Sequence, residues 1–360
     1  MRSNYKPLGN YIRLVEERNT KLEDLPLMGL SVSKVFFPTI ANLVGTDMSS
    51  YKIVYKNQFT YIADTSRRGD KIAIALSEDF DKMLVSQAYT PFEVKDTEEL
   101  LPEYLMMWFR RPEFDRYARF MSHGSAREIF AWEDMCNVLL PIPSPAKQKE
   151  IVKEYNTIVN RINLNKQLIQ KLEETAQTIY KEWFVEADSN NEPIFIGDLF
   201  KPKKGKNITR ENAIEGRFPV VAGGLEPSCF HNASNTSYPV VTISASGANA
   251  GFVRLYHTKV WAADCSYIDK NIFAEIYFAY VSLKINQALL MSKQEGTGQP
   301  HIYPEHIVTI PIYGYTKEKL KSFNKHCSSI YLRVNIAETE NQRLLELKDL
   351  LLSKLATVEN

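Results

Sequence analysis

Residues 147–184, KQKEIVKEYNTIVNRINLNKQLIQKLEETAQTIYKEWF, decide the fold of this chain. One residue in every three or four falls on a continuous seam: Ile151, Tyr155, Ile158, Ile162, Asn165, Ile169, Leu172, Ala176, Ile179 and Trp183. This is the a/d spacing of a coiled coil. The stretch has no Gly and no Pro, so we expect one helix about 55 Å long at ~1.5 Å per residue. Such a helix needs a partner of similar length.

The C-terminal stretch 317–357 provides that partner. It repeats the spacing at Leu320, Phe323, Cys327, Ile330, Val334, Ala337, Asn341, Leu344, Lys348, Leu351 and Leu355. Because a folded segment separates the two helices along the chain, an antiparallel pair is the simpler arrangement.

Each predicted seam carries one asparagine, Asn165 in the first helix and Asn341 in the second. With the helices antiparallel and their midpoints level, the two residues come out nearly opposite each other. A buried asparagine pair lowers stability but penalises slipped registers, in which each amide faces hydrocarbon. The alternative is that both side chains lie slightly off the seam, in water.

Composition indicates a globular protein of about two domains plus the helices. The chain has 360 residues, 44% hydrophobic content and a net charge of only +1, so any basic surface for nucleic acid has to be local. Its four cysteines form no CxxC pair and lie in no histidine cluster of metal-ligand spacing. We expect reduced thiols and no metal. No apolar signal core and no run of ~20 apolar residues is found, so a cytoplasmic protein is expected.

The two segments outside the long helices repeat one plan. Each contains strands, a helical stretch, a loop with glycine, and an Ile/Leu-Pro exit that leads into a long helix. In the first segment these are 51–55, 59–63 and 71–76 (strands), 98–121 (helix, broken at Pro112), 123–127 and 138–143; in the second they are 239–243 and 251–256 (strands), 274–293 (helix), 296–300 and 307–312. The repeat indicates a duplicated unit. The expected domains are 1–146, 147–186, 187–315 and 316–360.

The paired motifs resemble the specificity subunit of bacterial type I restriction-modification enzymes. They are SHGSAR and WEDMCNVLLPIPSPAKQKEIV in the first half, and EGTGQPHIYPEHIVTIPI with LLELKDLLLSKLA in the second. The second exit departs from the family pattern, because PIYGYT stands where a segment with Gln is usual. That puts only the local start of the helix in doubt.

The resemblance implies a fold, partners and cofactors. The fold is two similar α/β target recognition domains joined by two long antiparallel coiled-coil helices, with pseudo-two-fold symmetry. The partners are double-stranded DNA, two methylase subunits and, in the full complex, translocase/endonuclease subunits, with no membrane. S-adenosylmethionine is expected on the methylases and ATP with Mg²⁺ on the translocase. No cofactor is expected on this chain.

In the second unit, two stretches have the chemistry of DNA contact. Five cations with no acid among them fall in ten residues, Lys201, Lys203, Lys204, Lys206 and Arg210, in a segment without clear periodicity. They predict a phosphate-binding loop, unless the segment is simply a solvated basic turn. Small polar residues follow between two strands, with Ser244, Ser246 and Asn249 as candidate hydrogen-bonding groups. These could equally serve only to make the turn.

The first unit has candidates in matching places. Arg67, Arg68 and Lys71 lie between two strands, and an arginine there could bind guanine O6 and N7. The two glycine-containing loops add Ser125 and Arg127 in the first unit, and Thr297 and Gln299 in the second. The competing interpretation of both loops is a tight connection between elements.

Three hypotheses compete: an enzyme that acts on DNA alone, a non-catalytic DNA-recognition and assembly subunit, and a protein-binding scaffold. A DNA methylase would need a glycine-rich cofactor loop and an Asn-Pro-Pro-aromatic or Pro-Cys motif, and an ATPase would need GxxxxGK[ST]; the sequence contains none of them. We therefore expect a non-catalytic DNA-recognition and assembly subunit rather than an enzyme. A coiled-coil scaffold that binds protein without sequence-specific DNA binding is the alternative.

The favoured hypothesis predicts a bipartite DNA target. Each unit would recognise one short half-site, and the length of the helices would set the gap between them. Each methylase would dock near a unit and the adjacent helix end, where candidate contacts off the seam are Tyr180, Phe184, Leu345 and Leu352. The alternative for these four residues is packing inside the protein.

Overall fold

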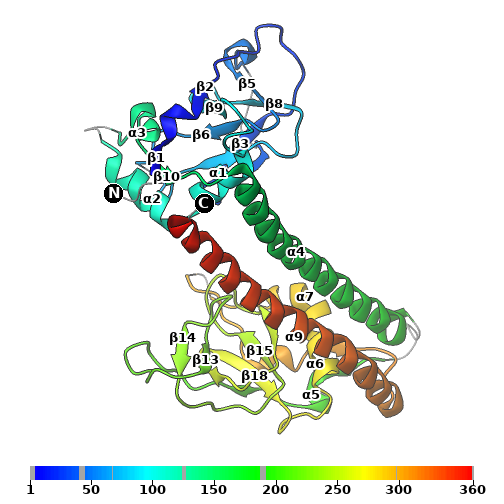
Figure 1. Cartoon of the computed structure of the whole chain (residues 1–360). Coiled ribbons are helices and arrows are strands. Elements are labelled where there is room, and N and C mark those ends of the chain that lie inside the picture. Colours follow the sequence, from blue (N-terminus) through cyan, green and yellow to red (C-terminus); the bar gives the residue numbers. More distant parts are fainter. Residues whose placement is uncertain are drawn as a thin grey trace. The chain divides into compact units, whose positions relative to one another are not determined.

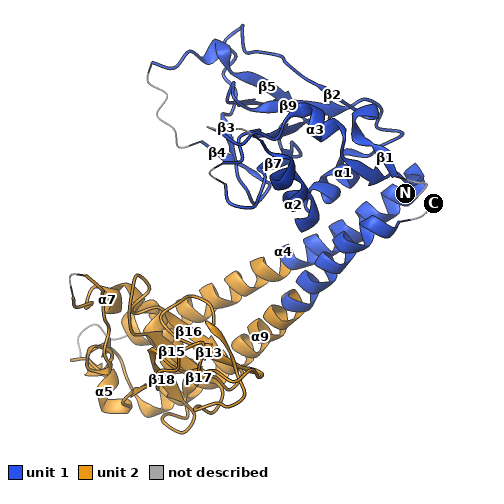
Figure 2. Ribbon diagram, turned by 90° about the vertical axis from the view of Figure 1, so that its left-hand side faces the viewer, with its two compact units in different colours: residues 1–163, 342–360 blue, residues 164–341 orange. Residues whose placement is uncertain are grey.

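The computed structural model describes residues 5–39, 45–66, 68–123, 127–186, 192–296 and 298–358 (Figure 1). The chain forms two compact units, which we call unit 1 (residues 1–163 and 342–360) and unit 2 (residues 164–341) (Figure 2). The two predicted long helices are confirmed as α4 (Pro145–Lys181) and α9 (Lys317–Lys354). Each helix has one part in unit 1 and the other in unit 2. No helix of the described residues has the length and apolar content to cross a bilayer.

The helix seams are buried or half-buried within each unit. In unit 1, Ile151 and Tyr155 of α4 join the core with Leu352 of α9. In unit 2, the Trp183 ring, just beyond α4, contacts Phe323 of α9 at 6.1 Å between ring centroids. Residues late in the first helix therefore lie beside residues early in α9, which is the antiparallel arrangement that the sequence predicts.

Asn165 and Asn341 lie opposite each other in unit 2. The Asn165 amide donates to Asn341 Oδ1 at 3.0 Å and to Glu340 Oε2 at 3.1 Å. Asn165 is 3% exposed, so a partner for its amide avoids the cost of an unsatisfied buried polar group. A role of this pair in setting the helix register stays a prediction.

Unit 1 is built on a four-stranded antiparallel sheet with strand order β2-β9-β6-β7. Three strand pairs, β1-β10, β3-β4 and β5-β8, complete its strands. The rings of Phe59 and Phe92 stack at 4.9 Å in its core, and Phe109 meets Phe59 edge to face. The elements of unit 1 outside the long helices are β1 (Tyr5–Pro7), η1 (Leu8–Asn10), β2 (Ile12–Leu14), β3 (Met28–Leu30), β4 (Phe36–Pro38), η2 (Met48–Ser50), β5 (Lys52–Tyr55), β6 (Phe59–Tyr61), β7 (Ile74–Leu76), β8 (Lys82–Val85), β9 (Thr90–Val94), α1 (Pro102–Phe109), α2 (Pro112–Met121), α3 (Trp132–Cys136), β10 (Leu139–Pro141) and the terminal η4 (Leu355–Thr357).

Unit 2 is built on a four-stranded sheet with strand order β12-β18-β15-β16. A second sheet, β14-β13-β17, and the pair β11-β19 accompany it. Its core gathers the rings of Tyr180, Phe184, Phe278 and Phe323. Its elements are η3 (the π-helical turn Glu182–Glu186), β11 (Ile194–Phe195), α5 (Ile196–Leu199), β12 (Lys203–Lys204), β13 (Phe218–Val221), β14 (Cys229–His231), β15 (Val240–Ser244), β16 (Val253–Tyr256), β17 (Trp261–Ala262), β18 (Cys265–Asp269), α6 (Ile276–Ile285), α7 (Gln287–Met291), α8 (Pro304–Ile307) and β19 (Pro311–Ile312).

The two four-stranded sheets have one topology. In each, the second and third strands to appear along the chain form an antiparallel pair, and the last strand inserts between the first and the second. The registers also match, since Tyr61 pairs with Ile74 in unit 1 as Ile243 pairs with Val253 in unit 2. The predicted internal repeat is therefore present in the backbone hydrogen bonding of both units.

Some predicted elements differ in extent from the structure. The helix expected over 274–293 is broken at Asn286, whose side-chain amide donates to the Ser282 carbonyl at 2.9 Å. Such a bond competes with continuation of the helix. The stretch 201–210, predicted as a loop, contains strand β12, because Lys203 and Lys204 pair with Tyr267 and Ser266 of β18.

Candidate nucleic-acid interface

One end of the unit 2 sheet brings two predicted segments together. β15 ends at Ser244, and the chain just beyond it pairs with the segment that follows the glycine-containing loop. The Ile302 amide donates to the Ala245 carbonyl at 2.9 Å, and the Gly247 amide donates to the Pro300 carbonyl at 3.0 Å. The small-polar stretch after β15 and the loop carrying Gln299 therefore form one surface.

The loop itself is closed by a backbone pair. The Glu295 amide donates to the His301 carbonyl at 3.1 Å, and the His301 amide donates back at 2.8 Å. Gly296, directly after the first member of the pair, has a φ of +100°, and a Cβ there would approach the Gln299 carbonyl oxygen to 2.7 Å. A side chain at this position would be strained and would collide, which explains the glycine.

Unit 1 makes the same bonds at the same end of its sheet. His123 and Ile129 close the loop with amide-to-carbonyl distances of 3.2 and 2.9 Å. The Phe130 amide donates to the Ala63 carbonyl at 2.9 Å, and the Thr65 amide donates to the Glu128 carbonyl at 2.9 Å. We call these equivalent surfaces the loop edge of each unit.

The matching bonds align residues of the two loop edges. Thr65 corresponds to Gly247, and Glu128 corresponds to Pro300, so Arg127 and Gln299 occupy equivalent positions. Both of these side chains are exposed. Two of the four loop residues predicted as DNA contacts, Arg127 and Gln299, thus occupy the same position of the repeated unit.

Two predicted serines have internal partners. The Ser244 hydroxyl, in a residue that is 4% exposed, donates to the Gly223 carbonyl at 3.0 Å. Ser246, 8% exposed, donates to the Asp264 carboxylate. These side chains shape the turn, which is the alternative that the sequence left open for them. Asn249 is half-buried in the same turn.

The cationic stretch of unit 2 runs along the first strand of the sheet. The side chains of Lys201, Lys203, Lys204, Lys206 and Arg210 are all exposed. Beyond β12, the amides of Gly205 and Lys206 donate to the carbonyls of Cys265 and Ala262 at 2.8 and 2.9 Å. A Cβ at Gly205 would come within 2.3 Å of the Ala263 carbonyl oxygen, so glycine lets the strand lie close to its neighbour. The Arg210 guanidinium donates to the Ser228 carbonyl at 2.8 Å.

At the equivalent place, unit 1 has mixed charge, because Arg13 and Arg18 stand where unit 2 has Lys201 and Lys206. Its first strand, β2, pairs with β9 through Leu14 and Phe92, and the Val15 amide donates to the Pro91 carbonyl at 3.1 Å. By register, Val15 and Glu16 stand where unit 2 has Lys203 and Lys204, and the Glu16 side chain is exposed. The repeat therefore carries opposite charge at the position of Lys204 and no charge at that of Lys203.

The remaining unit 1 candidates lie around the end of β6. Arg68 is half-buried and its Nε donates to the Asp64 carbonyl at 2.9 Å, while Lys71 is exposed. Hydrogen bonds from the Ser66 hydroxyl and amide lower the pKa of the Asp64 carboxyl below its ordinary value, and so keep it negative beside Arg127. The candidates Arg67, Ser125 and Thr297 lie outside the described residues.

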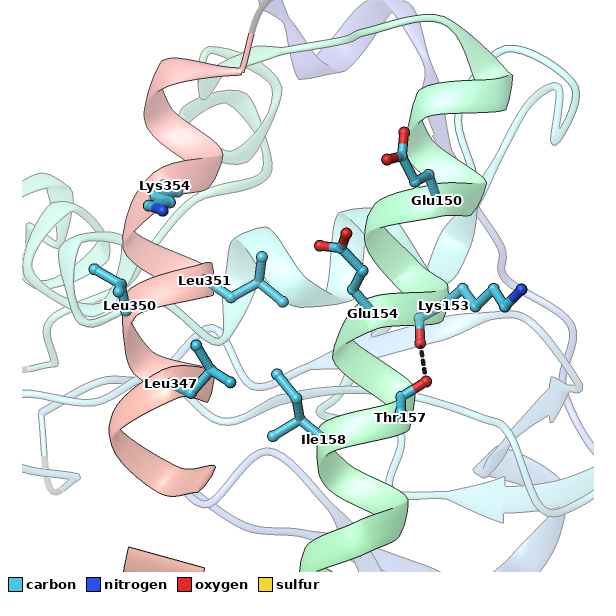
Figure 3. Close-up of a pocket in the computed structure, with 9 residues that line it drawn as sticks. All are labelled: Glu150, Lys153, Glu154, Thr157, Ile158, Leu347, Leu350, Leu351 and Lys354. Atoms are coloured by element: carbon cyan, nitrogen blue, oxygen red, sulfur yellow. Dashed lines mark hydrogen bonds between the residues drawn. The ribbon is translucent and has the colours of Figure 1, made fainter. Parts of the chain in front are cut away.

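A groove runs between the two helices in unit 1 (Figure 3). It has a volume of about 590 Å³. Glu150, Lys153, Glu154, Thr157 and Ile158 of α4 and Leu347, Leu350, Leu351 and Lys354 of α9 line it. Leu347 and Leu350 are 48% and 51% exposed. The groove therefore combines exposed leucines with two carboxylates and one ammonium group on the α4 wall and one ammonium group on the α9 wall.

The four predicted methylase contacts divide by burial. Tyr180 and Phe184 are each 1% exposed in the core of unit 2, and Leu352 is 5% exposed in the core of unit 1. Their packing leaves little surface for a partner. Leu345 is 43% exposed. Leu347 and Leu350 are not among the predicted contacts, although both are apolar residues off the predicted seam.

Comparison with known proteins gives a family match over part of the chain. Residues 28–174 match the model of the type I restriction modification DNA specificity domain. A putative type I specificity subunit from Mycoplasma pneumoniae is 29% identical over 174 residues, which are 45% of this chain and 44% of that protein. The specificity subunit of the type I restriction enzyme HindI from Haemophilus influenzae is 24% identical over 151 residues, which are 41% of this chain and 32% of that protein.

A third relative aligns with a longer part of the chain. A putative type I specificity subunit from Mycoplasma genitalium is 26% identical over 199 residues, which are 51% of this chain and 52% of that protein. The matches thus span between 32% and 52% of the length of these curated relatives.

One solved structure resembles the whole chain in fold. The crystal structure of the S subunit of a type I restriction-modification system from M. genitalium superimposes with a TM-score of 0.64. The alignment covers 99% of this chain and 96% of the other, at 17% sequence identity. The predicted fold class, α/β units joined by long helices, is confirmed by this likeness.

Proposed function

We propose, from the premise that this chain is related to the specificity subunits of type I restriction-modification systems, that it is the DNA-recognition and assembly subunit of such a complex. It binds double-stranded DNA at a bipartite target, one half-site for each unit. It docks two methylase subunits and is not itself catalytic. We expect it to work in the cytoplasm.

The observation that carries this proposal is the repeated loop edge. One chain holds two sheets of the same topology, and each sheet ends in the same closed loop with an exposed polar residue, Arg127 or Gln299, at the same position. Arg127 and Gln299 each adjoin a residue whose carbonyl accepts a backbone bond from the chain beyond the sheet, and base recognition requires side chains placed on such a fixed backbone. Two such edges support two half-sites.

The two edges supply different parts of DNA binding. The exposed lysines along β12 of unit 2 are suited to phosphate contacts, which position the protein and make binding depend on salt. Arg68 and Arg127 of unit 1 are suited to bidentate contact with guanine. Both sets lie at their unit's loop edge or on the strand that leads to it.

The helix groove of unit 1 supports docking of a methylase subunit. Its exposed leucines suit the apolar face of an amphipathic helix, the usual occupant of such a groove. Glu154 on one wall and Lys354 on the other place opposite charges across the groove, while Lys153 also lines the α4 wall and Glu150 is paired with Lys147 at 2.8 Å. This would orient a methylase helix that carries basic residues along one side and acidic residues along the other.

The chemistry of the complex would reside on the partners. S-adenosylmethionine would bind the methylase subunits, and ATP with Mg²⁺ would bind translocase/endonuclease subunits in the full complex. The proposal assigns none of these ligands to this chain.

The test is co-expression of the full chain with a cognate methylase, followed by mapping of adenine methylation on genomic DNA by single-molecule sequencing. A single bipartite motif that disappears when this chain is deleted is the expected result. Exchange of residues 1–146 for those of a relative should change one half of the motif and leave the other intact. A swap that changed both halves would contradict the assignment of one half-site to each unit.

A protein-binding scaffold is the second candidate, and the leucine-lined groove favours it equally. A scaffold would form a stable complex with the methylase and yield no methylation motif. The matched control is the double variant Leu347→Asp/Leu350→Asp, which places charge in the groove. It should abolish the complex while the isolated chain retains its DNA affinity, a result that a scaffold without DNA binding cannot give.

A further inference from the structure

The segment that leaves each closed loop is a short extended stretch, which we call the return strand: residues 129–131 in unit 1 and residues 301–303 in unit 2. Its central residue points inward in both units, since Phe130 is 0% exposed and Ile302 is 1% exposed. Side chains alternate in direction along an extended chain. The two residues that flank the centre therefore point outward at the loop edge.

The outward pair of unit 2 is His301 and Tyr303. Their rings stack at 5.9 Å between centroids with an angle of 11° between the planes. Tyr303 is 39% exposed and His301 is half-buried. His301 also forms a backbone bridge with Ser246, so the ring pair stands beside the turn that follows β15.

A neighbouring histidine fixes the position of Tyr303. The Tyr303 amide donates to His306 Nδ1 at 3.3 Å, and His306 Nε2 lies 3.1 Å from the Glu295 carboxylate. Glu295 is also one of the two residues that close the loop. The ring pair is therefore tied to the base of the loop rather than projecting freely.

The outward pair of unit 1 differs in chemistry. Matching backbone bonds place Ile129 where unit 2 has His301, and Ala131 where it has Tyr303. Ile129 is 38% exposed. The inward residue is apolar in both units, while the outward residues change from aliphatic to aromatic with polar ring atoms.

The outward residues of the two return strands therefore differ in which groups of a DNA base they can contact. An imidazole and a phenol can donate and accept hydrogen bonds at base edges, whereas an aliphatic side chain can contact only the methyl group of thymine. Packing alone does not require the change, because both positions face outward.

We propose that the outward residues of the return strands read bases, His301 and Tyr303 by hydrogen bonding in the half-site of unit 2 and Ile129 by contact with a thymine methyl in the half-site of unit 1. The inference rests on the proposed function and deepens it. It assigns specificity to residues that lie outside the basic stretch and beyond the loop tips.

The test uses the full chain co-expressed with its methylase and mapping of adenine methylation. His301→Ala and Tyr303→Phe should each relax one fixed base in the half-site of unit 2, with discrimination at that base falling roughly five- to a hundredfold. The half-site of unit 1 should stay unchanged. Tyr238→Phe is the matched control, because Tyr238 is 54% exposed and lies two residues before the start of β15, at the opposite end of that strand from Ser246.

The outcomes separate this inference from the proposed function. If the unaltered chain directs a bipartite motif and both variants direct the identical motif with equal stringency, the inference is wrong and the proposed function stands. If the unaltered chain directs no motif, the proposed function is wrong, and the inference falls with it. Thermal unfolding of each variant checks that any relaxed motif comes from a folded protein; because Tyr303→Phe keeps the ring, its melting temperature should match that of the unaltered chain.

Discussion

The two units share a backbone plan at their loop edges and differ in charge along the first strand of each sheet. In unit 2 the first strand carries Lys203 and Lys204, and in unit 1 the same register positions carry Val15 and Glu16. The hydrogen bonds that close the loops and tie them to the sheets are the same in both. One backbone plan therefore supports two different surfaces, and we expect the units to contribute unequally to DNA affinity.

The largest expected effect concerns the independence of the two cores. Phe323→Ala empties a site in unit 2 that is bordered by the rings of Tyr180, Phe184 and Phe278. The loss of buried area and the cavity should cost unit 2 about 3–5 kcal/mol. Hydrogen exchange should show lowered protection in the β15 and β18 amides. Phe109→Ala is the matched change in unit 1, and each variant should leave the amide protection of the other unit's sheet unchanged. Equal loss of protection in both sheets would show that the two cores are not independent.

The next prediction tests whether the difference in charge between the two units affects DNA binding. The triple variant Lys203→Ala/Lys204→Ala/Lys206→Ala removes three exposed cations from unit 2. If all three contact phosphates, the slope of log affinity against log salt should fall by roughly 3, and affinity at low salt should fall at least about tenfold. Glu16→Lys in unit 1 should change the slope by about 1 in the opposite direction. An unchanged slope in the triple variant would identify the stretch as a solvated basic turn.

A smaller effect separates the two turns at the loop edges. Gly247 has a φ of +77° with no atom within 4 Å of an added Cβ, whereas its counterpart Thr65 is buried and bonds to the Glu128 carbonyl. Gly247→Ala should therefore destabilise unit 2 by about 1 kcal/mol through backbone strain alone. Chemical denaturation measures it. Thr65→Gly in unit 1 tests the converse, since it should also destabilise, by removing the side-chain bond and adding flexibility.

The smallest effect is a dependence on pH of opposite sign in the two units. By register, Glu78 in unit 1 corresponds to His257 in unit 2, and burial raises the pKa of Glu78 and lowers the pKa of His257. The folded unit 2 thus binds a proton less readily than the unfolded chain, so its stability should fall as pH drops below 6.5 toward the lowered pKa. The folded unit 1 binds a proton more readily, so Glu78 should add stability as pH falls from its raised pKa toward 4.5.

Two substitutions check this dependence. His257→Phe should remove the loss of stability on acidification, and it also replaces a ring whose Nε2 has no hydrogen-bond partner in the described part of the chain. Glu78→Gln should remove the opposite trend. Unfolding curves followed between pH 4.5 and pH 7 for both variants and the unaltered chain would show it. If His257→Phe left the pH dependence of unit 2 intact, another group would be responsible.

The sequence predicted the parts of the fold that depend on local periodicity. The a/d spacing identified both long helices, and the antiparallel register placed Asn165 opposite Asn341. The repeated order of helix, loop and exit identified the duplicated unit. Those signals are local or recur at fixed spacing, so one sequence is enough to detect them.

The rest depends on long-range packing. Strand β12 is two residues long, and only its pairing with β18 makes it a strand, so no alternation could reveal it. Tyr180 and Phe184 lie off the seam, yet the unit 2 globular part covers that face of the helix and buries them. The return strands are only three residues long, so His301 and Tyr303 have no periodic signal. Their importance emerges only once the matching hydrogen bonds align the two units.

The alternation of the return strand has an evolutionary consequence. Its inward residue, Phe130 or Ile302, is buried in the core, while Ile129 and Tyr303 among its outward neighbours are 38% and 39% exposed. Substitution at the outward positions should therefore cost little stability, so a lineage could acquire new target sequences by point mutation without an intermediate that fails to fold. Because the unit is duplicated, the specificity of one unit can change while the other unit still binds its half-site.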